Sequence, residues 1–121
     1  MGRDIADALS HLSGQPILSD GLCQHVGEYT VIGAQGHLFC LAAPEAYGQD
    51  FDFPWRLEPL PVLPATFRLE PNFQKEKGRV VNSSLTQSIR ARLAKIKDLM
   101  AQARAVVHAG DPDREGQLIV D

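Results

Sequence analysis

The stretch "AVVHAGDPDREGQLIVD", residues 105–121, decides the expected fold. Its first residues form a short apolar run typical of a buried strand, and an acidic turn then leads into sequence typical of a helix. A strong helix pattern over residues 84–104 comes directly before it. The order helix, strand, turn and helix predicts an α/β fold with a mostly parallel sheet flanked by helices. Such sheets bind ligands at the carboxyl ends of their strands, where Asp111 and Asp113 are expected.

The helix predicted over residues 84–104 has two different faces. Ser83 or Ser84 provides the oxygen of an N-cap. Apolar side chains recur every three or four residues and form the stripe Leu85, Ile89, Leu93, Ile96, Met100 and Ala103. The opposite face carries the basic residues Arg90, Arg92, Lys95, Lys97 and Arg104. This face is either solvated or a ridge that contacts phosphates, and both interpretations stay open.

The remaining chain predicts shorter elements. Apolar spacing favours a helix over residues 2–13, and two β-rich runs flank a hairpin turn at residues 27–28. Five prolines in residues 54–71 exclude a regular helix and favour an extended surface segment. The polar and basic residues that follow this segment, 72–82, are expected to form a mobile loop. The apolar side chains expected to pin the proline-rich segment are Trp55, Leu57, Leu60, Val62, Leu63, Phe67 and Leu69.

Composition favours one globular domain over residues 1–121, with 44% hydrophobic and 22% charged residues. The net charge of −3 gives no general attraction to nucleic acid, so DNA binding requires a local basic face. Cys23 and Cys40 are isolated and are expected to be reduced, as in the cytoplasm. No signal peptide and no run of roughly 18 apolar residues occurs, so we expect a soluble protein without a membrane contact.

The acidic turn allows two interpretations. In the first, Asp111 caps a helix that starts at Pro112, while Asp113 and Glu115 complement the positive helix end. In the second, the three carboxylates bind a cation, because carboxylates this close repel one another when nothing compensates their charge. Mg²⁺ prefers such oxygens and suits a site shared with phosphate. We therefore predict Mg²⁺ on Asp111 and Asp113, with Glu115 as a proton-handling residue or outer ligand, and Arg114 facing either a phosphate or the carboxylates.

The string "HAGDPDREGQLIVD" closely resembles the Asp-x-Asp motif of the Toprim domain, in the form found in type IA DNA topoisomerases of the topoisomerase III subgroup. Weaker similarities accompany it across nearly the whole chain. They lie in "MGRDIADAL" (1–9), "GHL" (36–38), "WRLEPLPVLPATFRLEP" (55–71) and "AKIKDLMAQARAVVHAG" (94–110). The resemblance implies a Toprim-like, Rossmann-like fold, incomplete at both ends.

The resemblance implies a Mg²⁺-dependent enzyme that relaxes or decatenates DNA. Such an enzyme nicks one strand through a tyrosine, passes another strand and reseals the break. Asp111 and Asp113 would hold Mg²⁺, and Glu115 would complete the catalytic triplet. Single-stranded DNA would be the partner, with Arg114, Arg90 and Lys97 as candidate DNA contacts. His37 receives no role and is expected to be a packed or hydrogen-bonded turn residue.

Two family features are missing from this sequence. The family's first strand ends in Glu-Lys-Pro-Ser, and this sequence begins after that point; Tyr29 and Tyr47 lack the surroundings of the nucleophilic tyrosine. We therefore expect a fragment of a bacterial cytoplasmic protein, associated with nucleoid or plasmid, that does not cleave DNA alone. Its unpaired sheet edge predicts either self-association through that edge or a local rearrangement. The alternatives are a non-catalytic DNA-binding or interaction module, and another Toprim enzyme such as a primase or nuclease.

Overall fold

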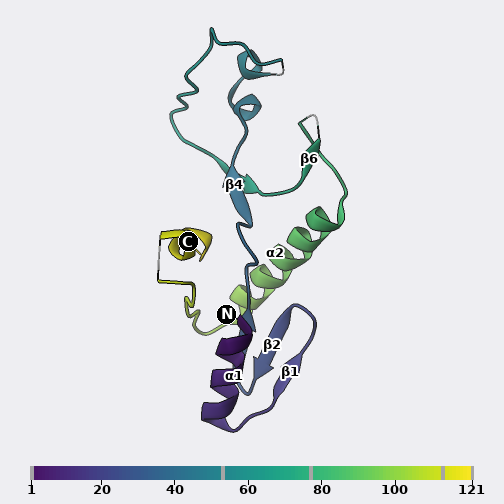
Figure 1. Cartoon of the computed structure of the whole chain (residues 1–121), viewed down its shortest axis with the longest axis vertical. Coiled ribbons are helices and arrows are strands. Elements are labelled where there is room, and N and C mark those ends of the chain that lie inside the picture. The colour runs from purple at the N-terminus through teal and green to yellow at the C-terminus, as the bar shows by residue number, and fades with distance from the viewer. Residues whose placement is uncertain (1, 53, 77, 113, 121) are drawn as a thin grey trace.

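The computed structural model describes residues 2–52, 54–76, 78–112 and 114–120. Figure 1 shows an elongated arrangement, with α1, β1 and β2 at one end, two 3₁₀ turns at the opposite end and α2 between them. Within the described ranges, no helix is long and apolar enough to span a membrane. The helices are α1 (Gly2–Ser13), α2 (Ser84–Gln102) and α3 (Arg114–Val120), and the 3₁₀ turns are Pro44–Tyr47 and Gln49–Phe51.

The N-terminal end is a helix packed on an antiparallel sheet, in the order β1-β2-β3. Gly27 has a φ of +57°, which a hairpin turn of this kind requires and which glycine adopts without strain. Ala6, Cys23 and Val26 are buried between the helix and the sheet. The predicted helix and hairpin are thus confirmed. The strands are β1 (Ile17–Ser19), β2 (Cys23–Val26) and β3 (Tyr29–Ile32).

The other two sheets of the described residues are small and also antiparallel. β4 (Phe39–Leu41) pairs with β5 (Leu69–Pro71), and β6 (Lys75–Glu76) pairs with β7 (Arg79–Val80). The last pair replaces part of the loop that was expected near residues 72–82. Because every strand pair in the described ranges is antiparallel, the mostly parallel sheet predicted from the sequence is not confirmed.

The apolar run at residues 105–110 is not a strand, which corrects the prediction. Val106 and Val107 are 66% and 81% exposed. A buried parallel strand needs neighbouring strands that take up its backbone hydrogen bonds, and the described residues provide none beside this segment. The segment therefore runs as an irregular connection between α2 and α3.

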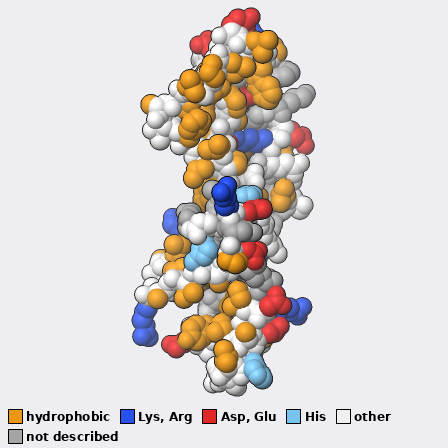
Figure 2. Space-filling view, turned by 60° about the vertical axis from the view of Figure 1, so that its left-hand side comes forward, with side chains coloured by type: hydrophobic (Ala, Val, Ile, Leu, Met, Phe, Trp, Pro, Cys, Tyr) orange, Lys and Arg blue, Asp and Glu red, His pale blue; other side chains and the backbone are white. Residues whose placement is uncertain are grey.

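The proline-rich segment contains no helix between residues 54 and 68, as predicted. Three of the side chains expected to pin it are nevertheless open to solvent, since Trp55, Leu57 and Leu63 are 69%, 83% and 78% exposed. Figure 2 shows hydrophobic side chains gathered over this end of the molecule. The expected anchoring is therefore confirmed only in part, with the Phe67 ring packed edge-on against Tyr47 at 6.3 Å between ring centres.

Helix α2 begins where the sequence predicted, and the Oγ atom of Ser83 accepts a hydrogen bond from the amide of Thr86 at 3.2 Å. Its buried line is different from the predicted stripe: Thr86, Ile89 and Arg92 are buried, whereas Leu85 and Met100 are more than half exposed. This buried line of α2 faces polar groups of the neighbouring loops, so it contains the hydroxyl of Thr86 and the guanidinium of Arg92. Apolar periodicity therefore located the helix but misplaced part of its buried face.

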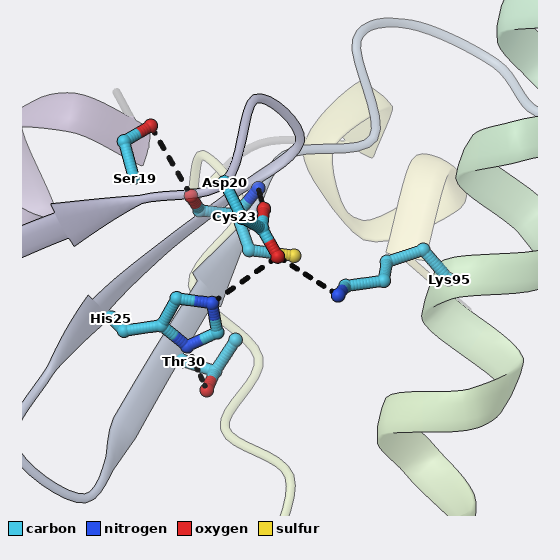
Figure 3. A network of polar contacts seen from close by, with 6 residues as sticks. All are labelled: Ser19, Asp20, Cys23, His25, Thr30 and Lys95. Atoms are coloured by element: carbon cyan, nitrogen blue, oxygen red, sulfur yellow. Dashed lines mark hydrogen bonds and ion pairs between the residues drawn. The ribbon is translucent and has the colours of Figure 1, made fainter.

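A polar network ties the N-terminal sheet to α2 (Figure 3). One carboxylate oxygen of Asp20 accepts a hydrogen bond from the Cys23 amide at 2.8 Å, and the other accepts one from Lys95 Nζ at 2.9 Å. The Nε2 atom of His25 lies 3.3 Å from the second oxygen, and its Nδ1 lies 3.1 Å from Thr30 Oγ1. The Lys95 ammonium group, with smaller contributions from the Cys23 amide and His25, holds the pKa of Asp20 far below its usual range.

We expect the variant Asp20→Asn to lose less stability in acid than the wild type. A carboxyl group whose pKa is lowered on folding stabilises the fold above its unfolded pKa of about 4, and this contribution is lost as the pH falls below that value. Urea unfolding midpoints at about pH 7 and about pH 3 measure the difference. As a control, Asp50→Asn should keep the wild-type pH dependence, because Asp50 is exposed and forms no ion pair with another described residue. Equal acid sensitivity of wild type and Asp20→Asn would contradict this assignment.

Candidate metal and DNA site

The acidic turn lies on the surface between the irregular segment and α3. Asp111 is exposed and lies three positions before the first helical residue, so it is outside α3 and not at its cap position. Glu115 is in the first turn of α3, and its side chain is 74% exposed. Asp113, the other predicted Mg²⁺ ligand, lies outside the described residues.

An open hollow adjoins Asp111. Its volume is about 670 Å³. Arg114 and His108 share this hollow with the Asp111 carboxylate, so an anionic group entering it would meet the positive charge of Arg114 beside the acidic turn. The lining residues are His108, Gly110, Asp111, Pro112, Arg114 and Gln117.

Backbone contact fixes the distance between α3 and the acidic turn. Gly116 is buried, and a Cβ atom built on it would lie 2.7 Å from the backbone nitrogen of Asp111 and closer still to its carbonyl oxygen. No side chain fits this space, because these are rigid backbone atoms. Sequence reasoning did not assign Gly116 a role, although a glycine inside a helix costs stability and usually marks a close approach.

The 36–38 turn meets the acidic turn through one side chain. The Nε2 atom of His37 lies 3.7 Å from Oε1 of Glu115, and both side chains are partly or largely exposed. The structure therefore brings together two segments that are far apart in the sequence. Sequence reasoning gave His37 no role, and no local pattern in the sequence links it to Glu115.

The donor chemistry of the turn fits Mg²⁺. Asp111 and Glu115 carry hard carboxylate oxygens that are open to solvent, and Mg²⁺ is bound by one or two carboxylates while keeping several waters. In the part of the chain that the structure describes, no cluster of three His, Cys, Asp or Glu side chains could hold a metal. The described residues thus provide suitable ligands and not a complete coordination shell.

The predicted basic face of α2 is divided between structural and exposed residues. Arg92 is buried, and Lys95 is bound to Asp20, so neither is available to phosphate. The guanidinium of Arg90 lies 5.0 Å from the centre of the Phe73 ring, while the side chain stays exposed. Lys97 is also exposed. Arg90 and Lys97 therefore stay predicted DNA contacts, and Arg92 and Lys95 do not.

Arg92 joins α2 to the loop that carries His37. Its guanidinium donates one hydrogen bond to the carbonyl oxygen of Gly33 and another to Oε1 of Gln35, the latter at 2.6 Å. The side chain is only 6% exposed. From the sequence, Arg92 was expected on the charged face of the helix. The three-residue spacing that aligns it with Thr86 and Ile89 is the pattern that would have indicated its burial.

Comparison with known proteins gives a match along the whole chain. A family model described as Toprim domain matches residues 2–121. The sequence is 36% identical over 123 residues to DNA topoisomerase 3 of Salmonella typhimurium and to that of Haemophilus influenzae, which covers all of this chain and 16% of each relative. It is 36% identical over 120 residues to DNA topoisomerase 3 of Bacillus subtilis, covering 98% of this chain and 14% of that relative. The chain thus spans about one sixth of the length of the curated relatives it matches.

Proposed function

The chain belongs to the Toprim domain family, and on this premise we propose that it is the Toprim part of a type IA DNA topoisomerase. That enzyme would relax or decatenate DNA by transient single-strand cleavage and religation. The observation that carries the proposal is the acidic turn at residues 111–115 within a chain similar over its whole length to DNA topoisomerase 3. A non-catalytic module, a primase or a nuclease is not favoured by this similarity.

We assign the acidic residues the roles that their chemistry supports. Asp111 and Asp113 hold Mg²⁺, and Glu115 completes the triplet as a proton-handling group or outer ligand. The bound ion would neutralise charge on a DNA phosphate and orient it. Arg114 supports this assignment, because it lines the same hollow as Asp111 and offers a positive charge to that phosphate.

The proposed substrate is a single-stranded DNA segment, and Arg90 and Lys97 provide further phosphate contacts from the exposed side of α2. These roles require no sequence recognition, because contacts to phosphate position a nucleic acid without reading its bases. Association with a bacterial nucleoid or plasmid follows as part of the same proposal.

The segment at residues 105–110 supports a proposal about assembly. Val106 and Val107 are largely exposed, and the described residues offer this segment no strand partner. We propose that it becomes a strand of the mostly parallel Toprim sheet when a neighbouring strand is supplied, and that copies of the isolated chain associate there otherwise. Light scattering at high concentration should give a mass above that of one chain, and the mass of a single chain would count against association.

Relaxation of negatively supercoiled plasmid tests the proposed function. A longer protein that contains this chain should relax the plasmid with Mg²⁺ and not with EDTA, while the 121-residue chain alone should not relax it. The variant Asp111→Asn in the longer protein should lose most of this activity. Relaxation by the isolated chain, or metal-independent relaxation by the longer protein, would overturn the proposal.

A further inference from the structure

The loop at residues 33–38 is held from two sides. On one side, the buried guanidinium of Arg92 binds the carbonyl oxygen of Gly33 and the side chain of Gln35. On the other side, Asn72 donates two hydrogen bonds to the loop. Its side-chain amide binds the carbonyl oxygen of His37 at 3.2 Å, and its backbone amide binds the carbonyl oxygen of Leu38 at 2.8 Å. A surface loop with this many fixed points has little freedom to move.

The backbone of this loop is turned sharply just before His37. Gln35 has a φ of +57°, the one positive value among non-glycine residues of the described ranges, and Gly36 follows with a φ of +87°. A non-glycine residue keeps this conformation only where its surroundings enforce it, and such positions cluster at functional sites. Here the side chain of Gln35 is bound by the guanidinium of Arg92. The turn directs His37 to the acidic residue Glu115.

We propose that His37 is a positioning residue for Glu115, so that the 33–38 loop forms a second wall of the metal site; the inference rests on the proposed function of that site. Glu115 is exposed at the surface of a short helix, and without a partner its carboxylate samples many rotamers. The approach of the His37 ring to Oε1, at 3.7 Å, is longer than a hydrogen bond but limits the space open to the carboxylate before the metal binds.

The contact itself is tested in the metal-free chain by NMR. The variant Glu115→Gln should shift the Nε2 resonance of the His37 ring, because it removes a charge 3.7 Å away. The matched control is Glu45→Gln, which changes a carboxylate bound to the Trp55 indole at 3.1 Å. This control should leave the His37 resonance in place. An unchanged His37 resonance in Glu115→Gln would overturn the inference and leave the proposed function intact.

The effect on the metal is tested by titrating the chain with Mg²⁺ alone and following amide resonances of residues 110–117. His37→Ala should weaken binding by about threefold to tenfold, since groups that orient a metal ligand matter less where water screens them. His37→Gln, which retains an N–H donor, should restore most of the affinity, and His11→Ala, at an exposed histidine of α1, should not change it.

The outcomes separate the inference from the function on which it rests. Wild-type affinity in His37→Ala, together with lost binding in Asp111→Asn, overturns the positioning role alone. No saturable Mg²⁺ binding by the wild-type chain overturns the proposed metal site, and the role of His37 at it as well. Weaker binding in His37→Ala with recovery in His37→Gln supports both.

Discussion

Replacing Gly116 with alanine is expected to lower Mg²⁺-dependent relaxation by the longer protein about 100-fold. The added Cβ would meet the backbone of Asp111, 2.7 Å from its nitrogen, where no flexible atom gives way. Either α3 or the Asp111 turn must then move by roughly an ångström, and a misplacement of this size is enough for such a loss. The relaxation rate at saturating Mg²⁺ measures the effect.

The control for this variant is Gly2→Ala. A Cβ at Gly2 would lie 4.0 Å from Cγ1 of Val31, which is an ordinary van der Waals contact. This variant should therefore relax plasmid at the wild-type rate. If Gly116→Ala were as active as Gly2→Ala, the close packing of α3 against the acidic turn would not matter for function.

Replacing Arg92 with methionine is expected to lower the free energy of unfolding by about 1.5–3 kcal/mol. The substitution keeps a long apolar stem but leaves the Gly33 carbonyl and the Gln35 amide oxygen without their donor. These bonds join the loop to α2, so losing them weakens the contact between two parts of the chain that are distant in the sequence. Urea unfolding followed by circular dichroism gives the value.

Two variants make the Arg92 result specific. Lys97→Met removes an exposed charge from the same helix and should change stability by less than about 0.5 kcal/mol. Arg92→Lys should recover only part of the loss, because an ammonium group lacks the planar pair of donors that reaches two acceptors. A loss below about 1 kcal/mol in Arg92→Met would show that the guanidinium is not an anchor.

Local signals predicted the helices and the N-terminal hairpin well. The bounds of α1 match those expected, and Ser83 caps α2 as its hydroxyl suggested. These elements depend on nearest neighbours along the chain, such as apolar spacing, caps and glycine turns. The strand expected at residues 105–110 depends on neighbouring strands, which local sequence does not specify.

Only part of the site could be predicted, again because local sequence does not specify contacts between distant segments. The carboxylates of Asp111 and Glu115 could be selected from their spacing and from the resemblance. Their surroundings could not, because His37 reaches Glu115 through a loop that Arg92 and Asn72 hold from distant positions. The spacing that aligns Arg92 with Thr86 and Ile89 indicates that it shares their buried side of α2, but it does not indicate which loop the guanidinium binds.

The central claim is that the acidic turn is a Mg²⁺ site, and a Mg²⁺ titration of the chain tests it most directly. Amide resonances of the wild type are followed alongside those of Asp111→Asn. We predict saturable shifts confined to the residues around the hollow in the wild type, and their loss in the variant, which keeps the shape of the side chain but removes its charge. Equal, weak and non-saturable shifts in both proteins would contradict the claim and leave the turn only a structural role.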